Sequence, residues 1–168
     1  MCIRDRSYAF DGGFSLAGGI SSTPTGILAT VEDDAFGLEA AYTADSYGIA
    51  VAYSDVEGTT DTTYWGVNGM YAFDFATISA GVESEDPVGG STKTGFFVGL
   101  SFPEVGAGTF DIGLATSANY ASSETEYYTY EASYSYPIND GMTITPGVFI
   151  QEGTTDKTGF AVKTSFSF

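Results

Sequence analysis

Carboxylates are the only side chains in this 168-residue sequence numerous enough to suggest acid–base or metal chemistry. There are 22 Asp and Glu residues but no His, which excludes a Ser-His-Asp or Cys-His arrangement and any His-ligated metal. Adjacent acidic pairs occur at Asp33/Asp34 and Glu85/Asp86, in Gly- and Thr-rich stretches with nothing to desolvate a carboxylate. The acidic stretches have neither EF-hand spacing nor a Gly-rich nonapeptide repeat. We therefore expect no enzyme activity, no resident metal and no cofactor.

Charge and composition narrow the class of protein further. The formal net charge is -17, which repels phosphate backbones and argues against nucleic acid as a partner. Aromatic residues make up 15% of the chain, too many for an acidic disordered segment. Tyr, Phe, Val, Ile and Thr recur in short runs between Gly, Pro, Asp and Asn, and no run of about 18 apolar residues could form a membrane-spanning helix. The sequence predicts an all-β protein.

The last segment, residues 157–168, shows the strand pattern most clearly. Its two alternating sets are Phe160, Val162, Thr164, Phe166 and Phe168 against Gly159, Ala161, Lys163, Ser165 and Ser167. One face of a strand is therefore apolar and bulky, and the other is small and polar. In a soluble sandwich the apolar face would point into a core, whereas in a membrane barrel it would point at lipid and the polar face at a wet lumen.

Upstream segments follow the same alternation, which gives about eleven segments of about ten residues, the length of a tilted membrane-spanning strand. The other segments are residues 7–11, 13–21, 34–43, 47–54, 63–73, 76–84, 93–102, 109–118, 126–136 and 142–151. Pro146 disagrees with the pattern, because proline donates no ladder hydrogen bond and usually marks an edge or a bulge. Single-chain bacterial barrels have an even number of strands. We therefore expect the C-terminal part of an antiparallel up-and-down transmembrane β-barrel that closes with 16 or 18 strands.

The connections alternate in length, as they do in outer-membrane barrels with short periplasmic turns and longer extracellular loops. The longer stretches are residues 22–33, 55–62, 85–92, 119–125 and 152–157. The shorter ones are residues 11–12, 44–46, 74–75, 103–108 and 137–141. If Phe168 lies at the periplasmic end, every longer stretch is extracellular.

Charged residues follow the same division. We interpret one set as an acidic extracellular mouth: Asp55, Glu57, Asp61, Glu85, Asp86, Glu124, Glu152 and Asp156. A second set alternates with the apolar residues and is predicted to line the pore: Glu39, Glu83, Asp111, Glu131 and Lys163. Carboxylates in these places would attract cations and deplete anions within about 8 Å at physiological salt. The alternatives are that the loop residues only keep the loops soluble and that the wall residues only hydrogen-bond across the wall.

The first residues differ from the rest of the sequence. Residues 1–6, "MCIRDR", contain the only Cys and two of the five cationic residues, and they lack the strand alternation. We interpret residues 1–6 as a non-native leader and residues 7–168 as the barrel domain, truncated at its N-terminus. The alternative is a complete cytosolic protein.

Three stretches carry a resemblance to a known family: "GFFVGLSFPEVGAGTFDIGLAT", "EASYSYPINDGMTITPGVFIQE" and "KTGFAVKTSFSF". They resemble the distal half of porins from marine cyanobacteria, which are similar to the carbohydrate-selective porin family. In that family a surface-layer-homology domain and a coiled coil precede the barrel. The alternating aromatics at the C-terminus also resemble the terminal strand that the barrel-assembly machinery recognises, so Phe160, Val162, Phe166 and Phe168 are interpreted as an assembly signal.

These observations predict an outer-membrane porin that contacts outer-membrane lipid, forms a homotrimer by analogy, and passes small hydrophilic solutes and inorganic ions with a preference for cations. Three alternatives stay open. The barrel could be selective for carbohydrates, it could mainly anchor the outer membrane with incidental conduction, or the chain could be a soluble β-sandwich or adhesin module.

Overall fold

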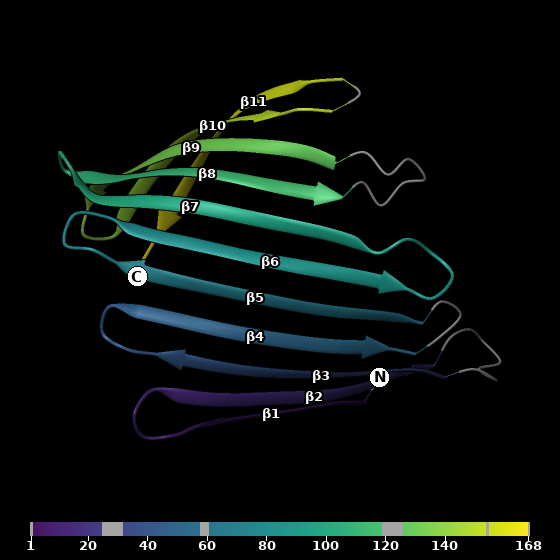
Figure 1. Ribbon diagram of the computed structural model, residues 1–168. Helices are drawn as coiled ribbons and strands as arrows, with labels where there is room; N and C mark the ends of the chain where they lie inside the picture. The colour runs from purple at the N-terminus through teal and green to yellow at the C-terminus, as the bar shows by residue number, and fades with distance from the viewer. Residues whose placement is uncertain (1, 25–31, 58–60, 119–125, 154, 168) are drawn as a thin grey trace. The chain divides into compact units, whose positions relative to one another are not determined.

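The computed structural model describes residues 2–24, 32–57, 61–118, 126–153 and 155–167, and this part of the chain contains strands and turns only (Figure 1). The strands are β1 (Cys2–Ala9), β2 (Phe14–Pro24), β3 (Glu32–Thr43), β4 (Tyr47–Val56), β5 (Thr62–Ala72), β6 (Thr77–Pro87), β7 (Lys93–Val105), β8 (Gly108–Ala118), β9 (Glu126–Asn139), β10 (Met142–Gln151) and β11 (Lys157–Phe166). None of the described residues belongs to a helix long and apolar enough to cross a membrane.

All eleven strands belong to one sheet, and their order in the sheet is their order in the sequence, from β1 to β11. Every strand pair with an assigned register is antiparallel. The prediction of an all-β, antiparallel, up-and-down arrangement is confirmed.

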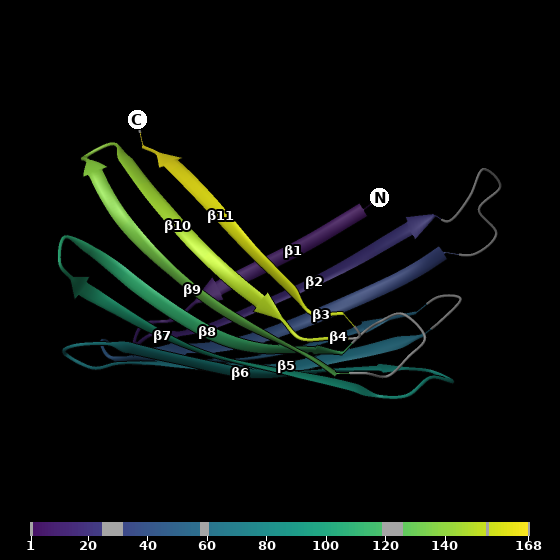
Figure 2. The same cartoon turned by 90° about the horizontal axis from the view of Figure 1, so that it is seen from above.

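The chain divides into two compact units. The first consists of Met1–Gly69 and Gly81–Thr94 and contains β1 to β4 with the adjoining parts of β5 and β6. The second consists of Met70–Ala80 and Gly95–Phe168 and contains β8 to β11 with most of β7. Within the second unit, β9 to β11 turn steeply away from β7 and β8 (Figure 2), in keeping with the twist that paired strands adopt.

The predicted strand positions are right, but many strand ends were placed too early. β4 runs on to Val56, β6 to Pro87, β7 to Val105 and β9 to Asn139. The reason is that a backbone ladder needs no apolar side chain, so pairing continues where the apolar pattern stops. Asp55, Glu85 and Asp86 therefore lie in strands rather than in loops.

The short turns are tighter than predicted for the same reason. The predicted turn at residues 103–108 contracts to residues 106–107, and the one at 137–141 contracts to 140–141. Gly106 has a φ of 66°, which a two-residue hairpin turn requires and which costs glycine little. The alternation of longer and shorter connections survives: 57–61, 88–92 and 152–156 are longer than 44–46, 106–107 and 140–141.

Two further strands differ from expectation. β1 spans Cys2–Ala9, so its backbone pairing with β2 includes most of the segment expected to be a leader, and it ends before Asp11. Pro146 lies inside the sheet, because β10 pairs with both β9 and β11. The ladder with β9 shows no pairing at Thr145 or Pro146, where proline has no N–H to donate, although the Thr145 hydroxyl lies 3.0 Å from that of Ser135 on β9.

Candidate functional site

The first unit has one face of bulky apolar side chains. The β3–β4 register puts Leu38 opposite Tyr53, Ala40 opposite Val51, and Tyr42 beside Ile49. Since paired residues share a face, these side chains form a continuous apolar surface. The side chain of Leu38 is 60% exposed, so nothing in the described structure covers this surface.

The second unit repeats the arrangement. The registers place Val98 opposite Leu114, Leu114 opposite Tyr130, and Tyr130 opposite Ile150, again on one face. On the last two strands Val148 lies opposite Phe160, which is 68% exposed.

Neither unit has a conventional hydrophobic core in the described residues. Ala76, 3% exposed, is the one hydrophobic side chain there that counts as buried, whereas Phe, Tyr, Leu, Ile and Val side chains of the apolar face are exposed. A soluble sandwich would bury the apolar face against a second sheet. The described strands form a single sheet, so no second sheet covers the apolar face within the described residues.

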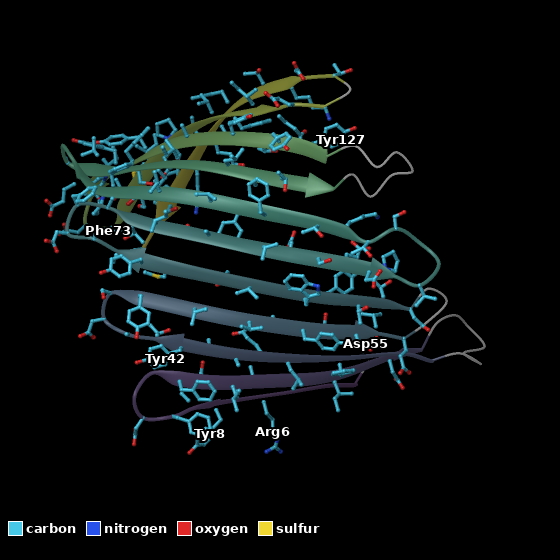
Figure 3. The ribbon with its side chains drawn as sticks, in the orientation of Figure 1. Arg6, Tyr8, Tyr42, Asp55, Phe73 and Tyr127 are labelled. Carbon is cyan, nitrogen blue, oxygen red and sulfur yellow. The ribbon has the colours of Figure 1, made fainter. Side chains whose placement is uncertain are left out.

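Most aromatic pairs lie at the short-turn end of the strands, a feature that the sequence-based prediction missed, whereas Phe36 and Tyr53 pair toward the loop end. In the first unit they are Tyr8 with Phe10, Phe10 with Phe14, and Tyr42 with Tyr47, with ring centroids 4.5 to 5.7 Å apart. In the second unit they are Tyr71 with Phe73, Phe73 with Phe75, Phe102 with Phe110, and Tyr134 with Tyr136. Tyr8, Tyr42 and Phe73 lie near the short turns in Figure 3. The clue in the sequence was at least one aromatic residue within a few positions of every short connection. Such belts are typical of a membrane–water interface.

The opposite face of the first unit is small and polar. Glu39 lies between Ala17 on β2 and Ala52 on β4, and its side chain is exposed. Glu83 is also exposed, and its Cβ is 3.8 Å from where a Cβ on Gly66 would lie. Both carboxylates are thus flanked by residues too small to cover them.

The opposite face of the second unit brings three predicted pore-lining residues onto one wall. Asp111 lies between Ser101 and Ser133, and Glu131 lies between Gly113 and Phe149. Lys163 lies opposite Thr145. All three are on the face that does not carry the bulky apolar rows.

Aromatic rings on this second face lie over glycines of the neighbouring chain segment. A Cβ added to Gly159 would overlap three ring carbons of Phe149, and one added to Gly153 would overlap the ring of Tyr127. Tyr127 lies near the loop end of β9 (Figure 3). Because these rings lie flat on glycines, they project little from the wall, and part of each ring stays exposed.

A family comparison matches almost the whole chain. The family model described as "Gram-negative porin" matches residues 3–158. The chain belongs to the Gram-negative porin family. Its location is therefore the bacterial outer membrane, as predicted.

Solved porin structures share the fold. A porin refined at 1.8 Å resolution matches with a TM-score of 0.80 at 16% identity, covering 98% of this chain and 60% of that one. An anion-selective porin from Comamonas acidovorans matches with a TM-score of 0.82 at 14% identity, covering 99% of this chain and 59% of that one. The KdgM porin in complex with disordered oligogalacturonate matches at 0.51 and 13% identity, covering 99% of this chain and 91% of that one. No curated protein matches significantly.

The chain spans about 60% of the length of the first two porins. Identities this low establish the fold alone. What each of those porins transports therefore says nothing direct about the solutes of this chain.

The acidic residues predicted at the porin mouth fall into two groups, one in each unit. In the first unit Asp55 ends the apolar row of β4 and accepts a 3.4 Å hydrogen bond from the Tyr53 hydroxyl, and it lies at the loop end in Figure 3. Glu57 donates its backbone N–H to the Asp34 carbonyl. Glu85 points to the small and polar side of β6 by alternation.

The remaining two residues of the first group belong to a hydrogen-bonded hairpin end. The Asp61 carbonyl accepts from the Val88 N–H, and Asp86 accepts a 2.8 Å hydrogen bond from the Thr92 hydroxyl. The Thr63 hydroxyl donates to the Asp86 carbonyl. The side chains of Asp61 and Asp86 therefore extend from backbone that interstrand hydrogen bonds hold in place.

In the second unit Glu152 and Asp156 lie in the β10–β11 connection, where Asp156 accepts from the Gly153 N–H at 3.3 Å. Glu124 lies outside the described residues.

The residues interpreted as an assembly signal lie on β11, the last strand in the sheet order. Phe160 and Val162 are exposed on the apolar face, opposite Val148 and Pro146. Phe166 pairs with Met142 on the same face. Phe168 lies outside the described residues.

Proposed function

We propose that the protein forms a water-filled channel through which small hydrophilic solutes and inorganic ions diffuse passively, with a preference for cations. One observation carries the proposal: bulky apolar side chains are exposed on one face of the sheet, while most side chains of the other face are small, hydroxyl-bearing or charged. If the first face meets lipid, the second faces a lumen, and its charges act on passing ions. Such a channel is not an enzyme.

The preference for cations rests on the charges of that second face. Glu39, Glu83, Asp111 and Glu131 outnumber the lysines on the same side of the strands, Lys93, Lys157 and Lys163, and the acidic loop-end residues add to the imbalance. The fold itself does not dictate the sign, since a porin described as anion-selective shares it.

Glu131 is the wall charge most open to a passing ion. It is exposed, Gly113 flanks it on β8, and no hydrogen bond or ion pair joins it to another residue of the described chain. An ion about 6 Å away gains about 0.7 kcal/mol in bulk water, and screening at physiological salt leaves about half of that. Because the carboxylate attracts cations and repels anions, the cation-to-anion permeability ratio depends on it about two- to threefold.

The test is reversal-potential measurement on the full-length protein in planar bilayers under a KCl gradient. We expect ohmic channels that favour K⁺, and Glu131→Gln should lower the permeability ratio about two- to threefold. Lys163→Gln is the control of opposite sign and should raise it. Equal ratios for both variants and the unmodified channel would remove these residues from selectivity. Silent bilayers would favour an anchoring barrel.

We propose that the protein belongs with cyanobacterial porins similar to the carbohydrate-selective family, that its barrel closes with 16 or 18 strands, and that it forms a homotrimer. We further propose that the protein inserts through the barrel-assembly machinery, with the β11 aromatics as the signal.

We also propose that residues 1–6 are a non-native leader. The β1–β2 register supports it, because Arg6 lies opposite Gly18, on the face that carries Leu16 and Ile20. A cation in the middle of a lipid-facing row is costly. From Ser7 onward β1 follows the other strands: Ser7 lies on the polar face opposite Ala17, and Tyr8 lies on the apolar face opposite Leu16.

A further inference from the structure

Phe149 is a large apolar side chain on the polar face of its strand. Its neighbours Val148 and Ile150 point to the apolar side, whereas Phe149 shares the polar side with Glu131 on β9 and Gly159 on β11. It is 38% exposed. Under the proposed function that exposed surface faces water, where an uncovered ring is unfavourable unless something binds it.

The ring is held in place from one side. Three of its carbons, Cδ1, Cε1 and Cζ, would lie within 3.0 Å of a Cβ on Gly159, so the ring rests where only glycine leaves room. The neighbouring wall positions on β10 and β9 are small or polar: Gly147, Ser133 and Thr129. A ring seated in this way loses little freedom when a second flat group stacks on it.

A carboxylate stands beside the ring. Glu131 is directly opposite Phe149, and residues paired in this way have Cβ atoms about 4.5 to 5.5 Å apart. Its other neighbour, Gly113, adds no side chain, and no described residue hydrogen-bonds or ion-pairs with the carboxylate. The nearest cation by register is Lys157, opposite Gln151 and two positions from Gly159, and it is not opposite Glu131.

We propose that Phe149 and Glu131 form a weak binding subsite for organic cations that carry a planar ring. The ring face attracts positive charge through its quadrupole and offers apolar stacking, while the adjacent carboxylate completes the charge match. A ring-bearing ammonium satisfies both groups at once, whereas an inorganic cation uses only the carboxylate and a ring-bearing anion meets repulsion. This subsite rests on the proposed channel and specifies one class of solute for it.

The experiment measures the permeability of benzylammonium relative to K⁺ through the full-length channel in planar bilayers, with methylammonium and benzoate as comparison ions. We expect benzylammonium to permeate better than its size predicts from methylammonium. Phe149→Leu should reduce its ratio to K⁺ about two- to fivefold, the equivalent of about 0.5–1 kcal/mol of exposed cation–π contact. Phe149→Tyr should retain the preference.

Phe97 supplies the matched control. It is also an aromatic residue on the polar face, 43% exposed, but its partner on β8 is Ala115, where Phe149 has Glu131 as its partner on β9. Phe97→Leu should leave the benzylammonium ratio unchanged. Equal losses in both variants, equal preference for benzoate, or no preference in the unmodified channel would each overturn the subsite while leaving K⁺ conduction and the channel intact. Silent bilayers would overturn the proposed function and the subsite with it.

Discussion

Val51 provides the most direct test of which face of the sheet meets hydrocarbon. It lies on the apolar face of β4 opposite Ala40, and 48% of it is exposed. The adjacent Ala50 lies on the other face, opposite Ala41. Val51→Arg and Ala50→Arg therefore place the same charge one residue apart on opposite sides of one strand.

The loss of stability expected for Val51→Arg depends on how deep Val51 lies in the membrane. The apolar row of β4 runs from Tyr47 to Asp55, eight residue steps or about 27 Å along the strand. At a tilt of about 40° this row crosses about 21 Å of membrane, and Val51 lies midway, near the bilayer centre. An arginine at that depth costs about 2–4 kcal/mol, a shift of about 30- to 900-fold in the folding equilibrium.

The assay is reversible denaturant unfolding of the full-length protein in lipid bilayers, with folded and unfolded forms separated by gel mobility. Val51→Arg should lose about 2–4 kcal/mol, and Ala50→Arg should change stability by less than about 1 kcal/mol, since its charge stays in water. Tyr53→Arg, nearer the loop end, should cost less than Val51→Arg.

Equal unfolding free energies for Val51→Arg and Ala50→Arg would show that both faces meet the same solvent. A larger loss at Ala50 would reverse the assignment of the two faces. Either result would also remove the basis for a lumen at Glu131.

Three further variants test local features. Tyr134→Phe removes the 2.7 Å hydrogen bond to the Val105 carbonyl, so the unfolding free energy should fall by about 1 kcal/mol in the same denaturation assay. Gly108→Ala should destabilise more than that, because its Cβ would meet the Ser135 carbonyl oxygen and the Tyr134 ring; wild-type stability would show that the hairpin shifts freely. Thr145→Val should cost about 1 kcal/mol and speed hydrogen exchange of the β9–β10 amides, by removing the hydroxyl contact with Ser135; unchanged exchange would mean that the contact does not stabilise the ladder.

The period-two alternation was enough to predict the strands and the two faces, because within each strand the apolar residues occupy every second position. Glu39 and Glu131 could be placed on the polar face by parity alone. The ends of the strands could not be predicted in this way, because the same backbone hydrogen bonding continues through Asp55 and Asp86. A charged residue ended the predicted strand, but it does not end the observed one.

Relations between strands were also beyond the sequence. That Phe149 lies over Gly159, or that the Tyr134 hydroxyl reaches the Val105 carbonyl, depends on register, and a shift of one residue would separate each pair. The aromatic pairs at the short turns were readable in principle. Tyr42 and Tyr47 flank one turn, and Phe102 and Phe110 flank another.

The absence of a packed interior among the described residues affects how freely this sequence can change. A Leu in an ordinary core fits a rigid cavity of fixed shape, but on the face that we propose to be lipid-facing Leu38 would meet fluid chains that conform to whatever replaces it. Ile, Val or Phe should serve there equally well, whereas the tight positions Gly108 and Gly159 admit nothing larger. A chain constrained mainly by polarity can diverge widely and keep its form, which agrees with TM-scores of 0.80 and 0.82 at only 16% and 14% identity.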